Sequence, residues 1–180
     1  QVARNEQLQL APMVEEIFTD LAPLAEKRSI TLEAEGDAAL TGSDALIYRM
    51  LFNLTENAVK YNRLGGSVRV ELAQGQEKCI IRVSDTGCGI PEEYQRSIFH
   101  PFFRVDKSRS REYGGAGLGL SLVWEIADLH GGSVWVEESS DKGTTIAVEL
   151  PAGAEKTAQA MASRCFCPPD RVDGCASLYS

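Results

Sequence analysis

Two kinds of apolar periodicity recur along the chain, and their combination limits the folds that it can adopt. Apolar residues recur every three to four positions, as in amphipathic helices, in three segments: 12–27, 43–61 and 118–130. Apolar and polar residues alternate, as in strands, in five segments: 30–35, 68–72, 79–84, 134–136 and 146–150. One apolar stripe on each helix requires a sheet face to cover it. The pattern therefore predicts an α/β (α+β) two-layer sandwich, with a mixed, mainly antiparallel sheet of about five strands packed on about three helices.

Turn signals refine this prediction. Residues 73–76 join two alternating segments and 139–143 join two others, so each pair is expected to form an antiparallel hairpin. Pro91 is expected to open a short helix, and Pro23 to kink or shorten the first long one. The sheet face away from the helices is expected to be the more polar one.

The charge balance excludes one large class of partners. The chain has 18 Lys and Arg against 26 Asp and Glu, a formal net charge of −8. Affinity for a nucleic-acid backbone comes from Lys and Arg, so we expect no nucleic-acid partner. No apolar run approaches the ~20 residues of a membrane span. Five cysteines, an odd number, favour a reducing compartment over a secreted disulfide framework.

A change of composition near Pro151 divides the chain into parts. We expect a domain over 11–151, preceded by the short segment 1–10 and followed by a tail at 152–180. The tail holds Cys165, Cys167 and Cys175. Three cysteines without a suitable histidine beside them are only a weak metal signature.

The first group of residues that suggests chemistry lies within the second predicted helix. Asn53, Asn57, Lys60 and Tyr61 are spaced i, i+4, i+7 and i+8, so they share one helix face. Asparagine is unfavourable inside a helix unless it has another role. Carboxamide oxygens one turn apart can ligate a hard cation or its waters, and the amide groups can bind phosphate. Alternatively, these four residues bind nothing and simply form the solvated polar face of the helix, which contrasts in polarity with its apolar stripe.

A second group, residues 85–91 (DTGCGIP), directly follows a predicted strand. An aspartate at a strand end, Asp85, can accept a hydrogen bond from an exocyclic amine. Gly87 and Gly89 allow the backbone to pass close to a flat ring. The alternative is an ordinary tight turn between a strand and a helix.

Glycines are concentrated at 114–119, immediately before the third predicted helix. Backbone N–H groups at a helix N-terminus, together with the helix dipole, favour a polyphosphate. The run matches neither the P-loop nor the Rossmann pattern, and a loop rather than a strand precedes it. The alternative is a flexible hinge.

An aromatic cluster and a basic loop precede these glycines. Residues 99–104 (FHPFFR) lead into a segment, 104–111, that carries four basic residues and one acidic residue. In an acidic chain, an aperiodic basic loop before a glycine-rich segment fits a mobile lid over phosphates. The alternative is a solvated run of charges.

Taken in this order, the motifs resemble those of the catalytic, ATP-binding domain of bacterial two-component sensor histidine kinases. Residues 53–61 match the N box (NLxxNAxKY), 85–89 the G1 box, 99–104 the F box and 115–120 the G2 box (GxGLGL). Gly143-Thr144-Thr145 resembles the final glycine-threonine motif. The resemblance covers about residues 10–151. It implies the Bergerat ATP-binding fold of the GHKL superfamily, which includes DNA gyrase B, Hsp90 and MutL.

The resemblance also implies ATP and Mg²⁺ as cofactors and assigns roles to individual residues. Asn57 would ligate Mg²⁺ between the ATP phosphates, Asn53 would assist it, and Lys60 would contact phosphate. These three form the implied catalytic set. Tyr61 would lie against the nucleotide, and Asp85 would accept the adenine N6 amine. The other implied nucleotide-binding residues are Gly87, Gly89, Ile90, Arg104, Lys107, Arg109, Gly115, Gly117, Leu118, Gly119, Leu120 and Thr144.

The implied reaction, phosphoryl transfer from ATP to a histidine, requires a partner. The two histidines, His100 and His130, both lie outside a phosphoacceptor motif. We therefore expect the acceptor on a separate dimerisation (histidine-phosphotransfer) domain of the same kinase, with residues 1–10 as the remnant of the linker from it. A response regulator would be an indirect partner. The isolated domain is expected to be monomeric and cytoplasmic, and its parent a homodimer anchored in the cell membrane.

Two other functions stay open on the sequence alone. The missing acceptor and the tail also fit a regulatory nucleotide-sensing module that does not catalyse. A gyrase- or Hsp90-like ATPase would need a glutamate where Asn53 stands, to orient the attacking water. Glu56, about 100° around the helix from Asn57, is a poor substitute. Ala116 is a small departure from the kinase pattern, which often has Thr or Ser at this position.

Overall fold

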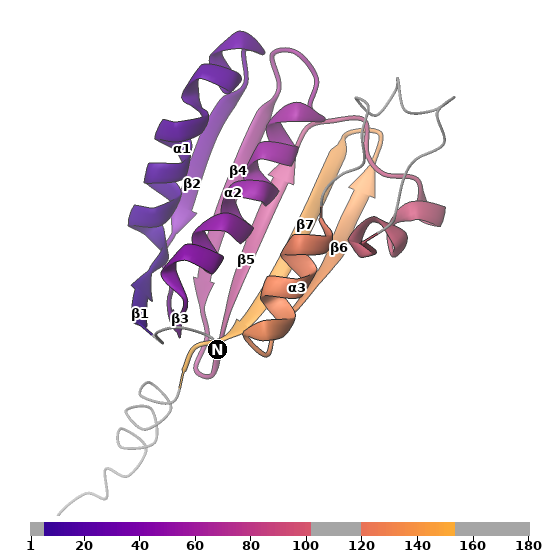
Figure 1. The fold of residues 1–180 in the computed structure, drawn as a ribbon. Coiled ribbons are helices and arrows are strands. Elements are labelled where there is room, and N and C mark those ends of the chain that lie inside the picture. Colours follow the sequence, from indigo (N-terminus) through magenta and orange to yellow (C-terminus); the bar gives the residue numbers. More distant parts are fainter. Residues whose placement is uncertain (1–5, 102–119, 154–180) are drawn as a thin grey trace, which may run out of the picture.

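A layer of helices covers one face of a five-stranded sheet (Figure 1). The structure, a computed structural model, describes residues 6–101 and 120–153. The helices are α1 (Leu10–Lys27), α2 (Asp44–Lys60) and α3 (Ser121–Leu129), with two 3₁₀ turns, η1 (Glu92–Tyr94) and η2 (Ser97–Phe99). The strands are β1 (Glu6–Gln9), β2 (Thr31–Gly36), β3 (Ala39–Gly42), β4 (Ser67–Gln74), β5 (Lys78–Asp85), β6 (Ser133–Ser140) and β7 (Gly143–Pro151). The predicted two-layer sandwich is confirmed.

The large sheet has the strand order β2-β4-β5-β7-β6. Strands β4, β5, β7 and β6 pair antiparallel in turn, and β2 lies parallel to β4 with Thr31 opposite Ser67. Both predicted hairpins and the mixed, mainly antiparallel character of the sheet are therefore confirmed. A bulge between Val136 and Glu138 shifts the register of the β6–β7 hairpin and leaves Ser139 opposite Thr144. Bulges of this kind re-aim side chains near a strand end.

The core lies between the helices and the sheet. Alternate residues of β5, such as Ile81 and Val83, point toward the helices and are buried. Each helix adds one apolar stripe, as its periodicity predicts. The largest fully buried side chains are Leu10, Ile17, Leu40, Ile47, Met50, Leu51, Leu54, Ile81, Ile98, Leu120, Ile126 and Leu150. Within residues 6–101 and 120–153, no helix is both long and apolar enough to cross a membrane.

The opposite face of the sheet is polar, as expected. Arg82 alternates with the buried residues of β5, so its side chain points away from the helices. Its guanidinium pairs with Glu137 of β6 at 2.8 Å, and Lys78 pairs with Glu149 at 2.6 Å. Exposed pairs of this kind contribute only ~0–1 kcal/mol each, so burial on the helix side supplies most of the stability.

A small sheet of two strands was not predicted. Strands β1 and β3 pair antiparallel, with Leu8 opposite Leu40 and both side chains buried. Each strand has four residues, too short a run for alternation to be recognised. The pair brings residues 6–9, which fall in the segment expected to precede the domain, into contact with its core.

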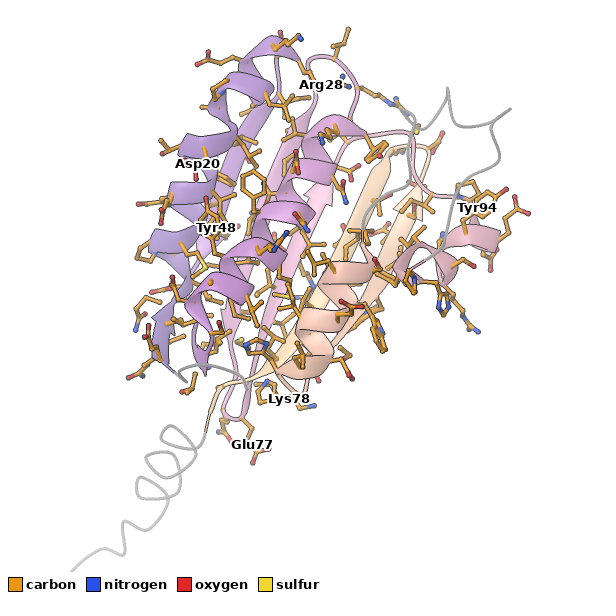
Figure 2. The ribbon with its side chains drawn as sticks, viewed as in Figure 1. Asp20, Arg28, Tyr48, Glu77, Lys78 and Tyr94 are labelled. Carbon is orange, nitrogen blue, oxygen red and sulfur yellow. The ribbon has the colours of Figure 1, made fainter. Side chains whose placement is uncertain are left out.

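The first helix continues through Pro23 to Lys27, so the proline does not shorten it. Helix α1 runs from Leu10 to Lys27, and Leu21 and Ala25 on either side of the proline are buried. The Tyr48 hydroxyl of α2 donates to the Asp20 carboxylate of α1, so the two helices are also tied on their outer side (Figure 2). Packing on both sides of the proline compensates for the backbone hydrogen bond that it cannot make.

Candidate functional site

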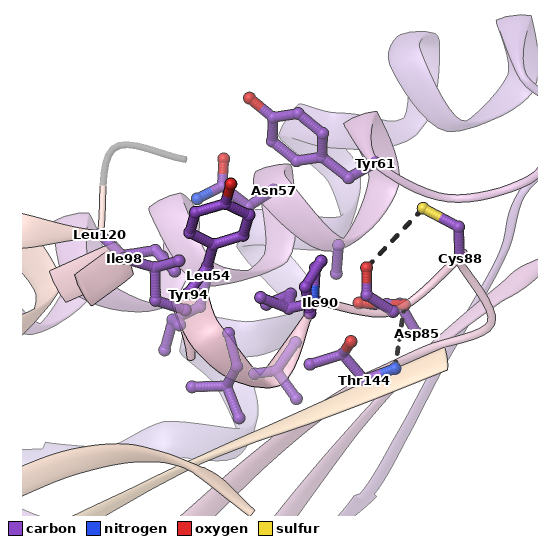
Figure 3. Close-up of a pocket in the computed structure, with 15 residues that line it drawn as sticks. Leu54, Asn57, Tyr61, Asp85, Cys88, Ile90, Tyr94, Ile98, Leu120 and Thr144 are labelled. Carbon is purple, nitrogen blue, oxygen red and sulfur yellow. Dashed lines mark hydrogen bonds between the residues drawn. The ribbon is translucent and has the colours of Figure 1, made fainter. Parts of the chain in front are cut away.

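A pocket lies where the C-terminal half of α2 faces the adjoining ends of β5 and β7 (Figure 3). Its apolar walls are Leu54, Val83, Ile90, Ile98, Leu120 and Ile146. Its polar lining residues are Asn57, Tyr61, Asp85, Tyr94 and Thr144. Apolar walls with a few polar groups are typical of a site that holds a flat organic ring.

Asp85 is the acidic group at the base of the pocket. It ends β5, and its Oδ1 accepts hydrogen bonds from the backbone N–H groups of Gly87 at 2.8 Å and Thr144 at 3.3 Å. The Cys88 thiol, nearby in the same loop, donates to the Gly89 carbonyl oxygen at 3.7 Å (Figure 3). Burial raises the pKa of Asp85 to about 6, while the two N–H groups act in the opposite direction. Because Oδ1 is held by the backbone, Oδ2 is the oxygen that can accept from a ligand.

Two glycines let the 85–91 loop and the β6–β7 hairpin meet around this carboxylate. Gly143 has φ +141°, and a Cβ there would lie 1.9 Å from the Asp85 carbonyl oxygen. Gly89 has φ +81°, and a Cβ there would lie 2.1 Å from the Ser140 carbonyl oxygen. A side chain at either position would push the hairpin away from the loop, so both glycines are required to close the pocket.

The structure brings together many of the residues that the sequence singles out. Asn57, Tyr61, Asp85, Gly89, Ile90, Leu120 and Thr144 all line the pocket. Gly87 lies next to it, bound through its N–H to Asp85. Asn53 lies one helical turn before Asn57 and lines a separate surface hollow between α1 and α2. Lys60 is exposed and pairs with Glu56 at 2.9 Å.

The remaining predicted residues cannot be placed in this way. Arg104, Lys107, Arg109, Gly115, Gly117, Leu118 and Gly119 lie outside the described residues. The predicted third helix begins at 118, whereas the described helix α3 begins at Ser121. The tail from residue 154 onward also lies outside the described residues.

Several lining residues were not predicted. Leu54 and Ala58 belong to the apolar stripe of α2, yet they line the pocket next to Asn57 and Tyr61. The polar face of α2 therefore lies beside the apolar stripe and not opposite to it. Tyr94, which belongs to η1, also lines the pocket. In the sequence, the apolar residues that follow Pro91 could have indicated that this segment forms part of the pocket wall.

Asn62 is a second group of the site that sequence reasoning missed. It is only 6% exposed, at the end of α2. Its Oδ1 accepts from the Arg63 N–H at 2.8 Å and the Thr86 hydroxyl at 2.9 Å, and its Nδ2 donates to the Ser67 carbonyl at 2.8 Å. Arg28, at the end of α1 in Figure 2, donates to the Asn62 carbonyl at 2.7 Å. This network fixes the end of α2 against the loop that carries Asp85.

Replacing this side chain should therefore destabilise the domain. We expect Asn62→Ala to lower the free energy of unfolding by about 2 kcal/mol, because buried donors and acceptors lose their partners. Urea denaturation gives this value directly. The matched control is Leu64→Ala, two positions along and 76% exposed, which should change stability by less than about 0.5 kcal/mol. Equal effects of the two substitutions would contradict the role of the network.

The raised pKa of Asp85 predicts a pH dependence of stability. In the folded chain the pKa is about 6 against an ordinary value of 3.8, so the folded state binds this proton more tightly than the unfolded state. The stabilisation is complete below about pH 4 and is lost as pH rises through about 6, a change of about 3 kcal/mol. The carboxyl carbon of Asp85, followed by NMR, should titrate with a midpoint near 6. A midpoint near 4 would show that the carboxylate is solvated.

One side chain at the pocket rim, that of Asn57, carries an oxygen that can ligate Mg²⁺. Asn57 is a half-buried residue of α2, and its carboxamide supplies the hard oxygen that Mg²⁺ prefers. Within the described part of the chain, no three His, Cys, Asp or Glu side chains gather as a metal cluster. A single amide oxygen fits an ion that takes most of its ligands from phosphates and water.

Comparison with known proteins gives consistent similarities. Residues 42–154 match the family described as histidine kinase-, DNA gyrase B-, and HSP90-like ATPase. The sensor histidine kinase RppB of Synechocystis sp. is 36% identical over 145 residues, which are 79% of this chain and 32% of RppB. The solved catalytic domain of the histidine kinase ThkA, in a nucleotide-free form, has a TM-score of 0.74 and 28% identity, covering 84% of this chain and 98% of that domain. A crystal structure of ThkA in complex with the response regulator TrrA has a TM-score of 0.69 at 24% identity, covering 84% of this chain and 43% of that one.

Proposed function

Since the chain belongs to the family of histidine kinase-, DNA gyrase B- and HSP90-like ATPases, we propose that it binds Mg-ATP in this pocket and donates the γ-phosphoryl group to a histidine on a separate dimerisation domain. The chain has the fold of the ATP-binding catalytic domain of sensor histidine kinases. It spans about a third of the length of the curated relative RppB. The phosphoacceptor and the partners of the whole protein are therefore part of the proposal.

The observation that carries the proposal is the Asp85 carboxylate at the base of an apolar pocket. Its Oδ1 is held by two backbone N–H groups, so Oδ2 can accept the N6 amine of an adenine ring lying between the apolar walls. A guanine ring would present a carbonyl oxygen at this point, and two acceptors would face each other. The pocket therefore favours ATP over GTP.

The phosphates would lie toward the part of the rim formed by α2. We propose that Asn57 ligates Mg²⁺, which would neutralise the charge that develops on the transferred phosphoryl group. Asn53 and Lys60 lie on α2 beyond the pocket lining, so they would act on the phosphates and not on the base. Leu120, the last residue of the G2 motif, lines the pocket. We propose that the G2 backbone before Leu120 binds the phosphates, and that Arg104, Lys107 and Arg109 contact them as the motif resemblance implies.

The surroundings of His130 support an acceptor outside this domain. Its Nε2 accepts from the Ser43 N–H at 3.2 Å, so the proton is on Nδ1, which donates to the Ile126 carbonyl at 2.7 Å. Both ring nitrogens are thus used to join α3 to the start of α2, and neither is available as a nucleophile. The remaining histidine, His100, ends a 3₁₀ turn on the surface.

The partners of the parent protein follow from the same proposal. The phosphorylated dimerisation domain would pass its phosphoryl group to a response regulator, the class of protein bound to ThkA in its crystal structure. We propose that this domain is cytoplasmic, where ATP is available, and that its parent is a homodimer anchored in the cell membrane.

A phosphotransfer assay tests the proposal. The chain is incubated with Mg²⁺, ATP labelled in the γ-phosphate and a purified dimerisation domain from the same kinase. We expect label on the acceptor domain that is labile in acid and stable in base, and none when the acceptor histidine is replaced by glutamine. ATP binding without any transfer would instead favour a nucleotide-sensing module that does not catalyse.

A further inference from the structure

Ser139 lies directly behind one wall of the pocket and joins two of its lining residues. Its Oγ accepts a hydrogen bond from the Ile90 N–H at 2.7 Å and lies 2.9 Å from the Thr144 Oγ1. The β6 bulge sets this register by placing Ser139 opposite Thr144. Ser139 itself is not among the residues that line the pocket.

The hydroxyl groups of Ser139 and Thr144 share a hydrogen bond in which either oxygen could be the donor. Since Oγ accepts from Ile90, the serine hydroxyl still has its own proton to donate. The Thr144 Oγ1 lies within reach of that proton, at 2.9 Å from the Ser139 Oγ. When Ser139 uses that proton to donate to Thr144, the proton of the Thr144 hydroxyl points elsewhere.

The position of Thr144 places its hydroxyl close to the Asp85 carboxylate. Thr144 lines the pocket, and its backbone N–H donates to Asp85 at 3.3 Å. In Figure 3 its side chain lies on the Ile90 side of that hydrogen bond. With Ser139 as the donor to Thr144, the threonine hydroxyl is itself a donor next to the carboxylate acceptor of Asp85. A base that enters the pocket meets an acceptor and a donor side by side.

We propose that Ser139 donates to Thr144 and is thereby a positioning residue for base recognition, which orients the Thr144 hydroxyl as a donor toward ring nitrogen N1 of adenine, directly or through one water. The inference rests on the proposed function. Adenine presents an amine donor at N6 and an acceptor at the adjacent N1, which complement Asp85 and Thr144. Hypoxanthine and guanine present the reverse order. Without Ser139, the Thr144 hydroxyl can rotate and accept as readily as donate.

The test compares dissociation constants for Mg-ATP and for Mg-1-deaza-ATP, in which a C–H group replaces N1. Wild-type protein should bind ATP about two- to tenfold more tightly, the value of one neutral hydrogen bond. This ratio should fall toward one in Ser139→Ala, because the Thr144 hydroxyl is no longer held as a donor. It should be kept in Ser140→Ala, the matched control, whose hydroxyl accepts from the Lys142 N–H at 3.2 Å in the exposed turn.

A purely structural role of Ser139 would give a different result. It would weaken both nucleotides equally, and because the ratio is taken within one preparation, a loss of folded protein does not alter it. In a Thr144→Val background, Ser139→Ala should change the ratio no further. An unchanged ratio in Ser139→Ala, or a ratio of one in wild type, would overturn the proposed role while ATP binding persists. Failure of the wild-type chain to bind either nucleotide would instead overturn the proposed function.

Discussion

Asp85→Asn is expected to weaken ATP binding by roughly 10- to 100-fold while leaving the fold at least as stable as in wild type. The backbone N–H groups of Gly87 and Thr144 would hold the amide oxygen of the asparagine, so its NH₂ group would face the N6 amine of adenine. Two donors would then oppose each other. The same substitution removes a buried charge whose pKa is raised to about 6, and so removes a cost to stability at neutral pH.

The opposite effects on binding and stability make this prediction specific. Calorimetric titration gives the dissociation constant for Mg-ATP, and thermal unfolding of the nucleotide-free chain gives the melting temperature. A variant that loses both ATP affinity and thermal stability would show that Asp85 supports the fold and does not recognise the adenine base. Asn62→Ala is the useful comparison, because it should lower the melting temperature through the adjoining hydrogen-bond network.

Asn57→Ala should have its largest effect on the chemical step. If Asn57 ligates Mg²⁺ between the phosphates, its loss should slow phosphotransfer to the dimerisation domain by roughly 100-fold or more. Affinity for ATP should fall only when Mg²⁺ is present. With the metal removed by a chelator, wild type and variant should bind ATP equally, because the base contacts through Asp85 are unchanged.

Asn53→Ala is the matched comparison for this substitution. The two residues lie one helical turn apart, but the described pocket includes Asn57 whereas Asn53 lines the hollow between α1 and α2. We expect the Asn53 variant to lose less phosphotransfer activity than the Asn57 variant. A loss in Asn57→Ala that is the same with and without Mg²⁺ would contradict metal ligation by this residue.

The sequence was sufficient to predict the layers of the fold because burial imposes a period. Alternation placed Ile81 and Val83 on the covered face of β5, and the stripe that includes Met50 and Leu54 predicted the buried side of α2. The β1–β3 pair could not be predicted in the same way. Leu8 and Leu40 meet through pairing of four-residue strands distant in the chain, and such short runs carry no clear period.

The candidate site was predicted less completely, for related reasons. Asp85, Gly89 and Thr144 could be identified because their motifs are local, whereas the hydrogen bonds that Asn62 and Ser139 make depend on tertiary contacts between distant segments. Helical spacing also has a limit. It groups residues by face but not by distance along the axis, so it could not show that Asn57 lines the pocket whereas Asn53, one turn earlier, lines the hollow between α1 and α2.

The most direct measurement is the ratio of the dissociation constants for Mg-ATP and Mg-ITP, in which a carbonyl replaces the N6 amine. Wild-type protein should bind ATP at least about tenfold more tightly, because the Asp85 carboxylate accepts from the amine and repels the carbonyl. In Asp85→Asn the ratio should fall to one or below, since the amide NH₂ can donate to the carbonyl of ITP. Equal binding of the two nucleotides by wild type, or an unchanged preference for ATP in the variant, would contradict the claim that Asp85 recognises adenine in this pocket.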